Sequence, residues 1–407
     1  MLSVPVPIVI FGGGVTGLWL LDRLRTLGIG AILVETNALG QGQTIAAQGI
    51  LHSGLKYALD GVMSDSGREA REMPARWQQS LAGEVAPNLS ALQVLSRSFY
   101  LWGTNSLSSR VGMFAARLGL QASLAAIPGN QRPPLLKTAQ GVLSVNEMVI
   151  STPSLLSTLA AQNQSSLLKV AAHDGIAIDR DSQGQTRIRL RADNNSDTIE
   201  LLPQRLVLAA GRGNQILRAQ LGLAAGQMQT RPLHMVLVRG DLPEFFGHCV
   251  EGARTRISIT STRDAQGTIA WQLGGQLAET GVSLDASTLI AQAQAELRLV
   301  LPMLDLRKTE WATYRVDRAE GSMPTGQRPS TFRLLQEEQV LTAWPTKLVL
   351  APKLIDAVID RLQFTADEST ALDLGCFADW PRPSVAVPPW DRDQAWQTII
   401  TRSNQAA

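Results

Sequence analysis

Residues 8–35 read IVIFGGGVTGLWLLDRLRTLGIGAILVE. The apolar run at residues 8–11 is short, rich in β-branched side chains and followed at once by glycines, which is typical of a buried parallel strand. Leucines then recur at nearly three-residue spacing up to Gly28, a residue that commonly ends a helix, and residues 31–35 form a second apolar run. Because such strand–helix–strand units are almost always parallel and right-handed, this stretch predicts the start of a doubly wound sheet.

The glycines after the first strand satisfy the pattern G-x-G-x-x-G through Gly12, Gly14 and Gly17. The first glycine permits a tight turn, the second lets a pyrophosphate approach the backbone, and the third lets the helix pack on the strand. Glu35 ends the second strand 18 residues after Gly17. A carboxylate at that position binds ribose hydroxyls and disfavours a 2′-phosphate. The pattern therefore predicts an adenine dinucleotide site, and a tight turn without a ligand is the alternative.

The next segment, residues 40–57, reads GQGQTIAAQGILHSGLKY. It contains many small and hydrogen-bonding residues and shows little helical periodicity, so it suits a loop that follows an extended cofactor. We expect Gln43 and Thr44 in this loop to contact the cofactor.

From His52 to Tyr57 this loop resembles the D-amino-acid-oxidase-like superfamily of FAD-dependent oxidoreductases. The resemblance is nearest to the branch of glycerol-3-phosphate dehydrogenases and L-2-hydroxyglutarate dehydrogenases, in which a His-x-Gly stretch lies beside the flavin. It extends over nearly the whole chain, in family order, through residues 147–153 (EMVISTP), 207–211 (VLAAG), 231–234 (RPLH), 314–318 (YRVDR) and 344–348 (WPTKL). One departure is Trp344-Pro345, which stands where the family usually carries glycines.

The resemblance implies FAD as the cofactor and a fold of the α/β and α+β classes. We expect a glutathione-reductase-like Rossmann domain that binds FAD, interleaved with a substrate domain built on a mixed β-sheet. The predicted FAD-binding domain comprises residues 1–86, 142–227 and 325–366, the substrate domain residues 87–141 and 228–324, and a C-terminal strap residues 367–407.

Oxidation by a flavin needs a group that takes the substrate's heteroatom proton and positive potential beside the reduced ring. His52 is the candidate base or flavin-orienting group, with a structural hydrogen bond in the loop as the alternative. Lys347, at the start of the last predicted helix (roughly residues 347–362), is the candidate source of positive potential. The alternative is a lysine that faces solvent in the first turn of that helix. Arg315 is the candidate substrate anchor, because its planar guanidinium group binds carboxylates through two hydrogen bonds. The alternative is that Arg315 is an ordinary surface residue. Gly211, at the end of the predicted strand at residues 205–211, completes the predicted cofactor contacts.

These residues predict an FAD-dependent oxidase or dehydrogenase. Its substrate is expected to be a small anionic amino or hydroxy acid, whose hydride passes from a C–H next to nitrogen or oxygen to flavin N5. Oxygen or a quinone is the expected electron acceptor. A flavin monooxygenase or NAD(P)H-linked flavoenzyme is one alternative, although Gly211-Arg212-Gly213 lacks the third glycine of a second nucleotide motif. A non-catalytic flavin-binding scaffold is the other, and Trp344-Pro345 keeps it open.

The composition excludes other classes. The 407 residues include 37 Lys and Arg against 35 Asp and Glu, with no long basic run, so we expect no nucleic-acid partner. Cys249 and Cys376 suggest neither a disulfide framework nor a thiolate site. The four histidines lack ligand spacing, so we expect no protein-held metal. No apolar run reaches the ~20 residues of a membrane span. A cytoplasmic protein is therefore expected, and peripheral membrane contact stays open.

Overall fold

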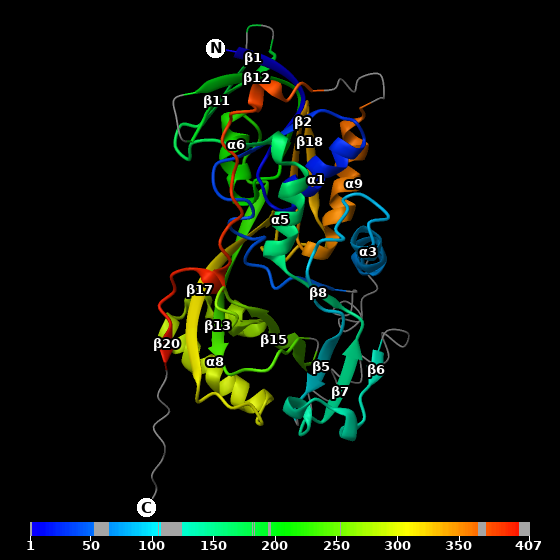
Figure 1. Cartoon of the computed structure of the whole chain (residues 1–407), viewed down its shortest axis with the longest axis vertical. Coiled ribbons are helices and arrows are strands. Elements are labelled where there is room, and N and C mark those ends of the chain that lie inside the picture. Colours follow the sequence, from blue (N-terminus) through cyan, green and yellow to red (C-terminus); the bar gives the residue numbers. More distant parts are fainter. Residues whose placement is uncertain are drawn as a thin grey trace, which may run out of the picture.

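The computed structural model describes residues 2–52, 65–104, 106, 124–180, 182, 184–193, 197–252, 254–364 and 372–398. Figure 1 shows two lobes along the longest axis of the molecule. The upper lobe contains β1, β2, β11 and β12 with their helices, and the lower lobe contains β5, β7, β13 and β17. None of the helices in the described ranges is long and apolar enough to cross a membrane.

The upper lobe is built on a mixed sheet that contains eight strands in the described part of the chain. Its main path runs β10-β11-β12-β1-β2-β9, and the hairpin β18–β19 joins it beside β12. The strands are β1 (Leu2–Phe11), β2 (Ala31–Glu35), β9 (Leu167–Lys169), β10 (Ile176–Arg180), β11 (Thr186–Arg191), β12 (Thr198–Leu208), β18 (Arg333–Glu337) and β19 (Val340–Trp344).

The centre of this sheet confirms the doubly wound start. Strand β1 pairs in parallel with both β2 and β12, and β19 pairs in parallel with β12. The carboxyl ends of these four strands therefore lie at one edge, which is where open α/β sheets bind their ligands. Short alternating segments broken by turns between residues 167 and 202 predict an antiparallel meander, but this prediction is wrong for the first of them, because β9 pairs in parallel with β2.

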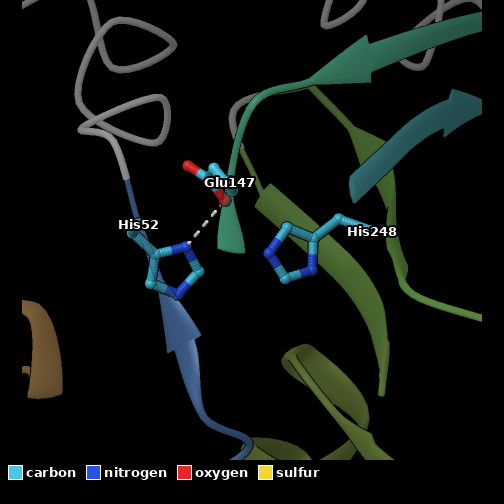
Figure 2. Close-up of side chains that lie close together, drawn as sticks. All are labelled: His52, Glu147 and His248. Carbon is cyan, nitrogen blue, oxygen red and sulfur yellow. Dashed lines mark hydrogen bonds and ion pairs between the residues drawn. The ribbon is translucent and has the colours of Figure 1, made fainter. Parts of the chain in front are cut away.

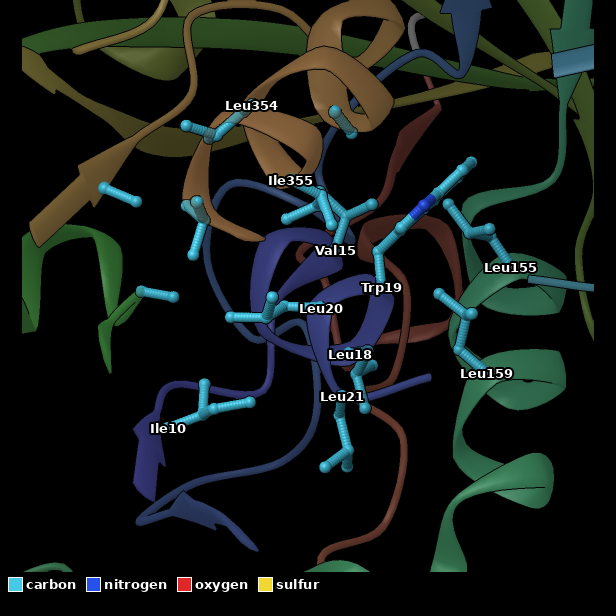
Figure 3. Close-up of a cluster of buried hydrophobic side chains, with 14 of the residues drawn as sticks. Ile10, Val15, Leu18, Trp19, Leu20, Leu21, Leu155, Leu159, Leu354 and Ile355 are labelled. Carbon is cyan, nitrogen blue, oxygen red and sulfur yellow. The ribbon is translucent and has the colours of Figure 1, made fainter. Parts of the chain in front are cut away.

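Helix α1 (Val15–Thr26) connects β1 to β2 and is buried on several sides. Figure 3 shows its side chains between those of α9 (Ala351–Leu362) and α5 (Thr152–Gln162). Trp19 meets Trp77 edge to face with ring centroids 4.7 Å apart, and both side chains are almost fully buried. Because protein interiors are densely packed, this core fixes the position of the N-terminal end of α1.

The lower lobe is built on a second mixed sheet, with nine strands among the described residues. Its order is β20-β17-β13-β16-β15-β14-β5-β7-β6. The strands are β5 (Phe99–Gly103), β6 (Leu124–Ala126), β7 (Gly141–Val145), β13 (Met228–Gly240), β14 (Gly247–Glu251), β15 (Arg254–Arg263), β16 (Ile269–Gly274), β17 (Thr309–Gly321) and β20 (Gln397–Thr398).

A small sheet links the two lobes. In it β8 (Met148–Ile150) pairs with β3 (Ile50–Leu51) and β4 (Val94–Ser96). The remaining helices are α3 (Asp65–Leu81), α6 (Asn214–Gln220), α7 (Gln276–Thr280), α8 (Ala286–Val300), and the short 3-10 helices η1 (Gly129–Gln131), η2 (Pro134–Leu136), η3 (Gln164–Ser166), η4 (Gly211–Gly213), η5 (Gly281–Ser283), η6 (Leu348–Leu350), η7 (Gly375–Phe377) and η8 (Pro389–Asp391).

Strands of the two large sheets alternate along the chain, and the C-terminal segment contacts both sheets. Lys169 donates its backbone N–H to the Pro381 carbonyl in the upper lobe, and β20 pairs with β17 in the lower lobe. The predicted division assigns residues 142–227 to the FAD-binding domain, whereas strand β7 (Gly141–Val145) pairs with β5 in the lower sheet. The chain therefore returns to the upper lobe only after β7.

Candidate active site

The glycine turn after β1 has no room for side chains. Gly12 has φ +106°, and a Cβ on it would lie 2.5 Å from the Ala210 Cα. A Cβ on Gly17 would lie 2.0 Å from the Gly12 carbonyl oxygen. Gly14 is the N-cap of α1, so the first backbone N–H groups of the helix follow it. This is the geometry that lets a helix N-terminus bind a phosphate group.

Glu35 lies against this turn at the end of β2. Its Oε2 accepts a hydrogen bond of 2.6 Å from the Gly13 N–H, and its Oε1 accepts one of 2.8 Å from the Asn37 N–H. An ionised carboxylate has about four acceptor positions, so it can accept further bonds from ribose hydroxyls. Thr44 approaches the same helix end, where its Oγ1 accepts from the Val15 N–H at 3.2 Å.

Residues 43–52 run along the lower sheet and contact β17, β16 and β15 in turn. The Gln43 Oε1 accepts from the Ala319 N–H of β17 at 3.1 Å. Further along, Gln48 donates to the Gln272 carbonyl oxygen of β16 at 3.0 Å and accepts from the Ser258 hydroxyl of β15 at 2.6 Å. His52 then lies beside β14. The hydrogen bonds of Gln43 and Gln48 thus hold this loop against the lower sheet.

Tyr314 also holds this loop. Its hydroxyl donates to the Ala46 carbonyl at 3.1 Å and accepts from the Gln272 amide at 2.9 Å. Burial raises the pKa of Tyr314 well above its usual range, so the phenol stays neutral. Its hydroxyl group therefore links the loop to β16 and β17 through hydrogen bonds.

The far end of the loop places His52 beside two residues from distant parts of the chain. Figure 2 shows Glu147 and His248 next to it. The His52 Nδ1 lies 3.3 Å from the Glu147 Oε2, and the two imidazole centroids are 5.6 Å apart. One potential ligand atom from each of the three residues lies within 4.8 Å of the others. Histidine spacing in the sequence does not predict this group. The rest of the His52–Tyr57 stretch lies outside the described residues.

The closing junction before α9 contains a buried cation. Lys347 is 8% exposed and donates from Nζ to the Ser330 carbonyl oxygen at 3.4 Å, so the alternative of a solvent-facing lysine is wrong. Nearby, the Arg328 Nη2 donates to the Thr346 carbonyl oxygen at 3.2 Å. Within the described ranges, the buried Arg328 Nε and Thr346 Oγ1 have no hydrogen-bond partner in the protein. Such atoms are rare, and a ligand is one way to satisfy them.

Arg315 and Arg318 lie on opposite faces of β17, because side chains alternate along a strand. The exposed Arg315 donates to the carbonyl oxygens of Val282 and Leu284 at 2.7 and 2.8 Å, which holds the turn around η5. These bonds favour a structural role for Arg315, and its contact with substrate stays a prediction. The Arg318 side chain is only 15% exposed and lies on the same strand face as Tyr314.

Arg318 belongs to a cluster of five charges. Arg231 forms an ion pair of 2.9 Å with the fully buried Glu320, and Arg318 lies 3.3 Å from Glu279. Arg328 interacts electrostatically with the same carboxylates. Burial lowers the pKa of both Arg318 and Arg328, and the neighbouring guanidinium groups lower it further. Three guanidinium groups against two carboxylates leave the cluster with surplus positive charge.

Gly211 lies at the carboxyl end of β12 with φ +56° and begins η4. Asn214, three residues later, accepts from the Ala210 N–H at 2.8 Å and donates to the Ala343 carbonyl oxygen at 3.1 Å. It is fully buried and ties the end of β12 to the end of β19. Gly211 and the closing junction are thereby held at the same edge of the sheet as Gly12.

A family model described as FAD dependent oxidoreductase, DAO, matches residues 7–346. The chain belongs to this family. The probable FAD-dependent oxidoreductase PA4991 of Pseudomonas aeruginosa is 37% identical over 390 residues, which cover 94% of this chain and 97% of that protein. The crystal structure of PA4991 covers 96% of this chain and 98% of its own, with a TM-score of 0.77 and 33% identity.

Two more distant solved structures share the fold of this DAO-family chain. Glycine oxidase from Geobacillus kaustophilus has a TM-score of 0.64 at 16% identity and covers 94% of this chain and 100% of its own. The L-α-glycerophosphate oxidase of Mycoplasma pneumoniae, solved with FAD bound, has a TM-score of 0.64 at 13% identity. It covers 89% of this chain and 95% of its own. The predicted superfamily, fold class, enzyme class and FAD cofactor are confirmed, and the narrower branch stays a prediction.

The residues at both ends of the site fit FAD. The constrained turn at Gly12 and the carboxylate of Glu35 suit its pyrophosphate and ribose. At the other end, the unsatisfied donors of Arg328 and Thr346 suit the carbonyl groups of the flavin, and buried Lys347 suits its negative charge after reduction. Each of these contacts between the DAO-family enzyme and FAD is a proposal.

Replacing Glu35 with alanine should weaken FAD binding. The variant loses the acceptor of the Gly13 N–H and a carboxylate that we expect to bind ribose. Hydrogen bonds to charged groups are worth about 1.5–3 kcal/mol, so the FAD dissociation constant should rise about 10- to 100-fold. Equilibrium titration of FAD into stripped protein measures this change. Glu84→Ala, at an exposed position, is the matched control and should bind FAD like the original chain.

Proposed function

We propose that this enzyme oxidises a small anionic amino or hydroxy acid whose reactive C–H lies next to nitrogen or oxygen. When bound, FAD supplies the hydride acceptor, flavin N5. The protein's tasks are then to bind the acid, to orient its C–H bond and to take the heteroatom proton. Oxygen or a quinone is proposed as the electron acceptor.

The observation that carries this proposal is the surplus positive charge of the cluster formed by Arg231, Arg318, Arg328, Glu279 and Glu320. It lies between Ala319, which contacts the cofactor loop, and Thr346 at the closing junction. Partly buried guanidinium groups bind carboxylates strongly and with defined geometry. A substrate carboxylate here would balance the cluster's charge. We therefore assign substrate anchoring to Arg318 in preference to Arg315.

The proposed base is His52, at the other end of the loop that starts near Ala319. Its side chain is 34% exposed, so one edge of the imidazole is open to a bound molecule while the other meets Glu147. Imidazole accepts and releases protons near neutral pH. Lys347 is proposed to add positive potential at the closing junction, where it favours an anionic reduced cofactor.

The test is anaerobic reduction of the flavin in the dark, followed by its visible absorbance. Glycine, L-proline, iminodiacetate, L-2-hydroxyglutarate and glycerol phosphate are the probes. The amino acids and glycerol phosphate represent substrate types named for solved structures with this fold, including glycine oxidase, L-proline dehydrogenase and glycerophosphate oxidase. At least one acid should bleach the flavin. Air or a soluble quinone should then restore the colour.

NADH and NADPH are the comparison probes. Neither should bleach the flavin, because the segment after β12 lacks a second complete nucleotide motif. Bleaching by NADPH alone would instead establish an NAD(P)H-linked flavoenzyme. Bleaching by dithionite but by none of the probes would contradict the proposed substrate class and favour a flavin-binding scaffold.

A further inference from the structure

A buried carboxylate lies directly behind the proposed base. The Glu147 side chain is fully buried, and its Oε2 is 3.3 Å from the His52 Nδ1 (Figure 2). His52 is 34% exposed, so its two ring edges differ in environment. Nδ1 faces the Glu147 carboxylate. The Nε2 edge is therefore the one that we expect to meet a substrate.

The backbone sets this pairing. In the small sheet that links the lobes, Leu51 of β3 pairs with Met148 of β8 in antiparallel register. His52 follows Leu51 and Glu147 precedes Met148, so the antiparallel register brings His52 and Glu147 opposite one another. Glu147 also lies two residues after Val145, where β7 ends in the lower sheet. The carboxylate is thus held by strands of two sheets, and its position does not depend on a free loop.

Two aromatic rings support the same arrangement. His248 lies beside His52 with a centroid distance of 5.6 Å and an angle of 22° between the ring planes. Phe99 contacts His248 edge to face at 4.5 Å. Both come from the neighbouring strands β5 and β14, which pair with each other. The imidazole of His52 is therefore confined by packing as well as by the carboxylate.

We propose that Glu147 is a positioning residue that fixes the tautomer of His52. A neutral imidazole carries one proton, and an ionised carboxylate only accepts hydrogen bonds. The proton must then reside on Nδ1, which donates to Glu147, and Nε2 keeps its lone pair. Nε2 is the atom that takes the heteroatom proton of the substrate, while the hydride leaves from the adjacent carbon. The arrangement rests on the proposed function of His52 as base and follows the tautomer logic of carboxylate–histidine pairs.

The tautomer can be measured without any substrate. Nitrogen-15 NMR of histidine-labelled holoenzyme reports which ring nitrogen carries the proton, and the chain has only four histidines. His52→Gln identifies the His52 signals. They should show a protonated Nδ1 and an unprotonated Nε2. In Glu147→Gln, the amide N–H₂ can donate to Nδ1, so the proton should move to Nε2.

Two further variants make the result specific. Glu147→Asp keeps the negative charge but moves it away from the His52 Nδ1, so it should give a mixture of tautomers. If the Glu147→Gln protein does not fold, Glu147→Asp takes its place in the experiment. Glu200→Gln is the matched control. Glu200 is also buried and accepts from the Ser3 hydroxyl, in the upper sheet away from His52. Its variant should leave the His52 signals unchanged.

Kinetics supply the second readout. With whichever of the five probes bleaches the flavin, Glu147→Gln should lower the limiting rate of flavin reduction about 10- to 100-fold, the range found when a carboxylate that orients a metal-bound histidine is lost. The apparent dissociation constant should stay within about twofold, because Glu147 does not contact substrate. Glu147→Asp should recover part of the rate.

Three results would overturn the proposal. The first is an unchanged His52 tautomer in Glu147→Gln. The second is a loss of substrate affinity with an unchanged limiting rate. The third is a stoichiometric bound metal, since two imidazoles and one carboxylate are also a zinc ligand set, and elemental analysis detects it. If the tautomer result holds but none of the four amino and hydroxy acids bleaches the flavin, the proposed substrate class fails and the positioning role of Glu147 stands.

Discussion

Gly12→Ala is expected to produce a protein that no longer retains FAD. A Cβ at this position lies 2.5 Å from the Ala210 Cα, and φ +106° disfavours any side chain. The turn must therefore move away from β12, which displaces the N–H groups that we propose to bind the pyrophosphate. A shift of this kind should raise the FAD dissociation constant at least about 100-fold, equivalent to about 2.8 kcal/mol. Visible absorbance of the purified variant and titration with FAD measure the loss.

The control separates the local clash from the general strain of a positive φ. Gly222 has φ +66°, and a Cβ added there would have no atom within 4 Å, so Gly222→Ala bears the backbone strain alone. It should lose about 1 kcal/mol of stability and keep its flavin. Thermal unfolding of both variants without FAD shows whether the polypeptide still folds. A Gly12→Ala protein that binds FAD as tightly as Gly222→Ala would contradict the assignment of the turn.

His52→Gln is expected to slow flavin reduction about 10²- to 10⁴-fold, the usual contribution of a positioned base. Glutamine keeps a hydrogen-bonding group beside Glu147 but cannot take a proton at neutral pH. Flavin content should therefore persist while the limiting rate of reduction falls. Stopped-flow absorbance under anaerobic conditions, in the dark, measures this rate for the acid that reduces the original protein.

His173→Gln is the matched control for that experiment. His173 is exposed in a turn of the upper lobe, and its variant should reduce at the original rate. A normal rate in His52→Gln would mean that the histidine only supplies a structural hydrogen bond in its loop. Loss of flavin from the variant would instead favour a cofactor-orienting role.

The nucleotide end of the site could be predicted because its determinants are local. Gly12, Gly17 and Glu35 lie within one strand–helix–strand unit, whose spacing fixes the turn and the strand end. The amphipathic pattern of residues 285–301 and the two short apolar runs within residues 332–343 likewise predict a helix and a hairpin from local sequence, and they agree with α8 (Ala286–Val300) and with β18 and β19. Short-range periodicity is enough to predict elements of this kind.

The substrate end depends on contacts that sequence spacing does not encode. His52 and Glu147 are 95 residues apart and meet only through the register of β3 with β8. Arg315 and Arg318 are close in sequence, but the pleat of β17 points them to opposite faces, and only the true register decides which one faces the cofactor loop. A carboxylate directly before an apolar strand was the available signal for Glu147. Nothing comparable marked Asn214 or Arg328.

Lys347 illustrates a third case. Its place before a helix left open both a source of positive potential and a solvent-facing first turn, but η6 intervenes before α9, and Lys347 is buried and donates to the Ser330 carbonyl oxygen. Sequence patterns identify the helix and do not show which segment covers its N-terminal end. Tertiary contacts therefore decide the environment of this lysine.

Purified protein offers the most direct test of whether the turn at Gly12 and the carboxylate of Glu35 bind FAD. The measurement is the visible spectrum of the full chain, with the cofactor identified after acid release. It should show oxidised flavin, and FAD should be recovered in an amount close to that of the protein. A colourless protein that gains no flavin absorbance when mixed with FAD would contradict this assignment.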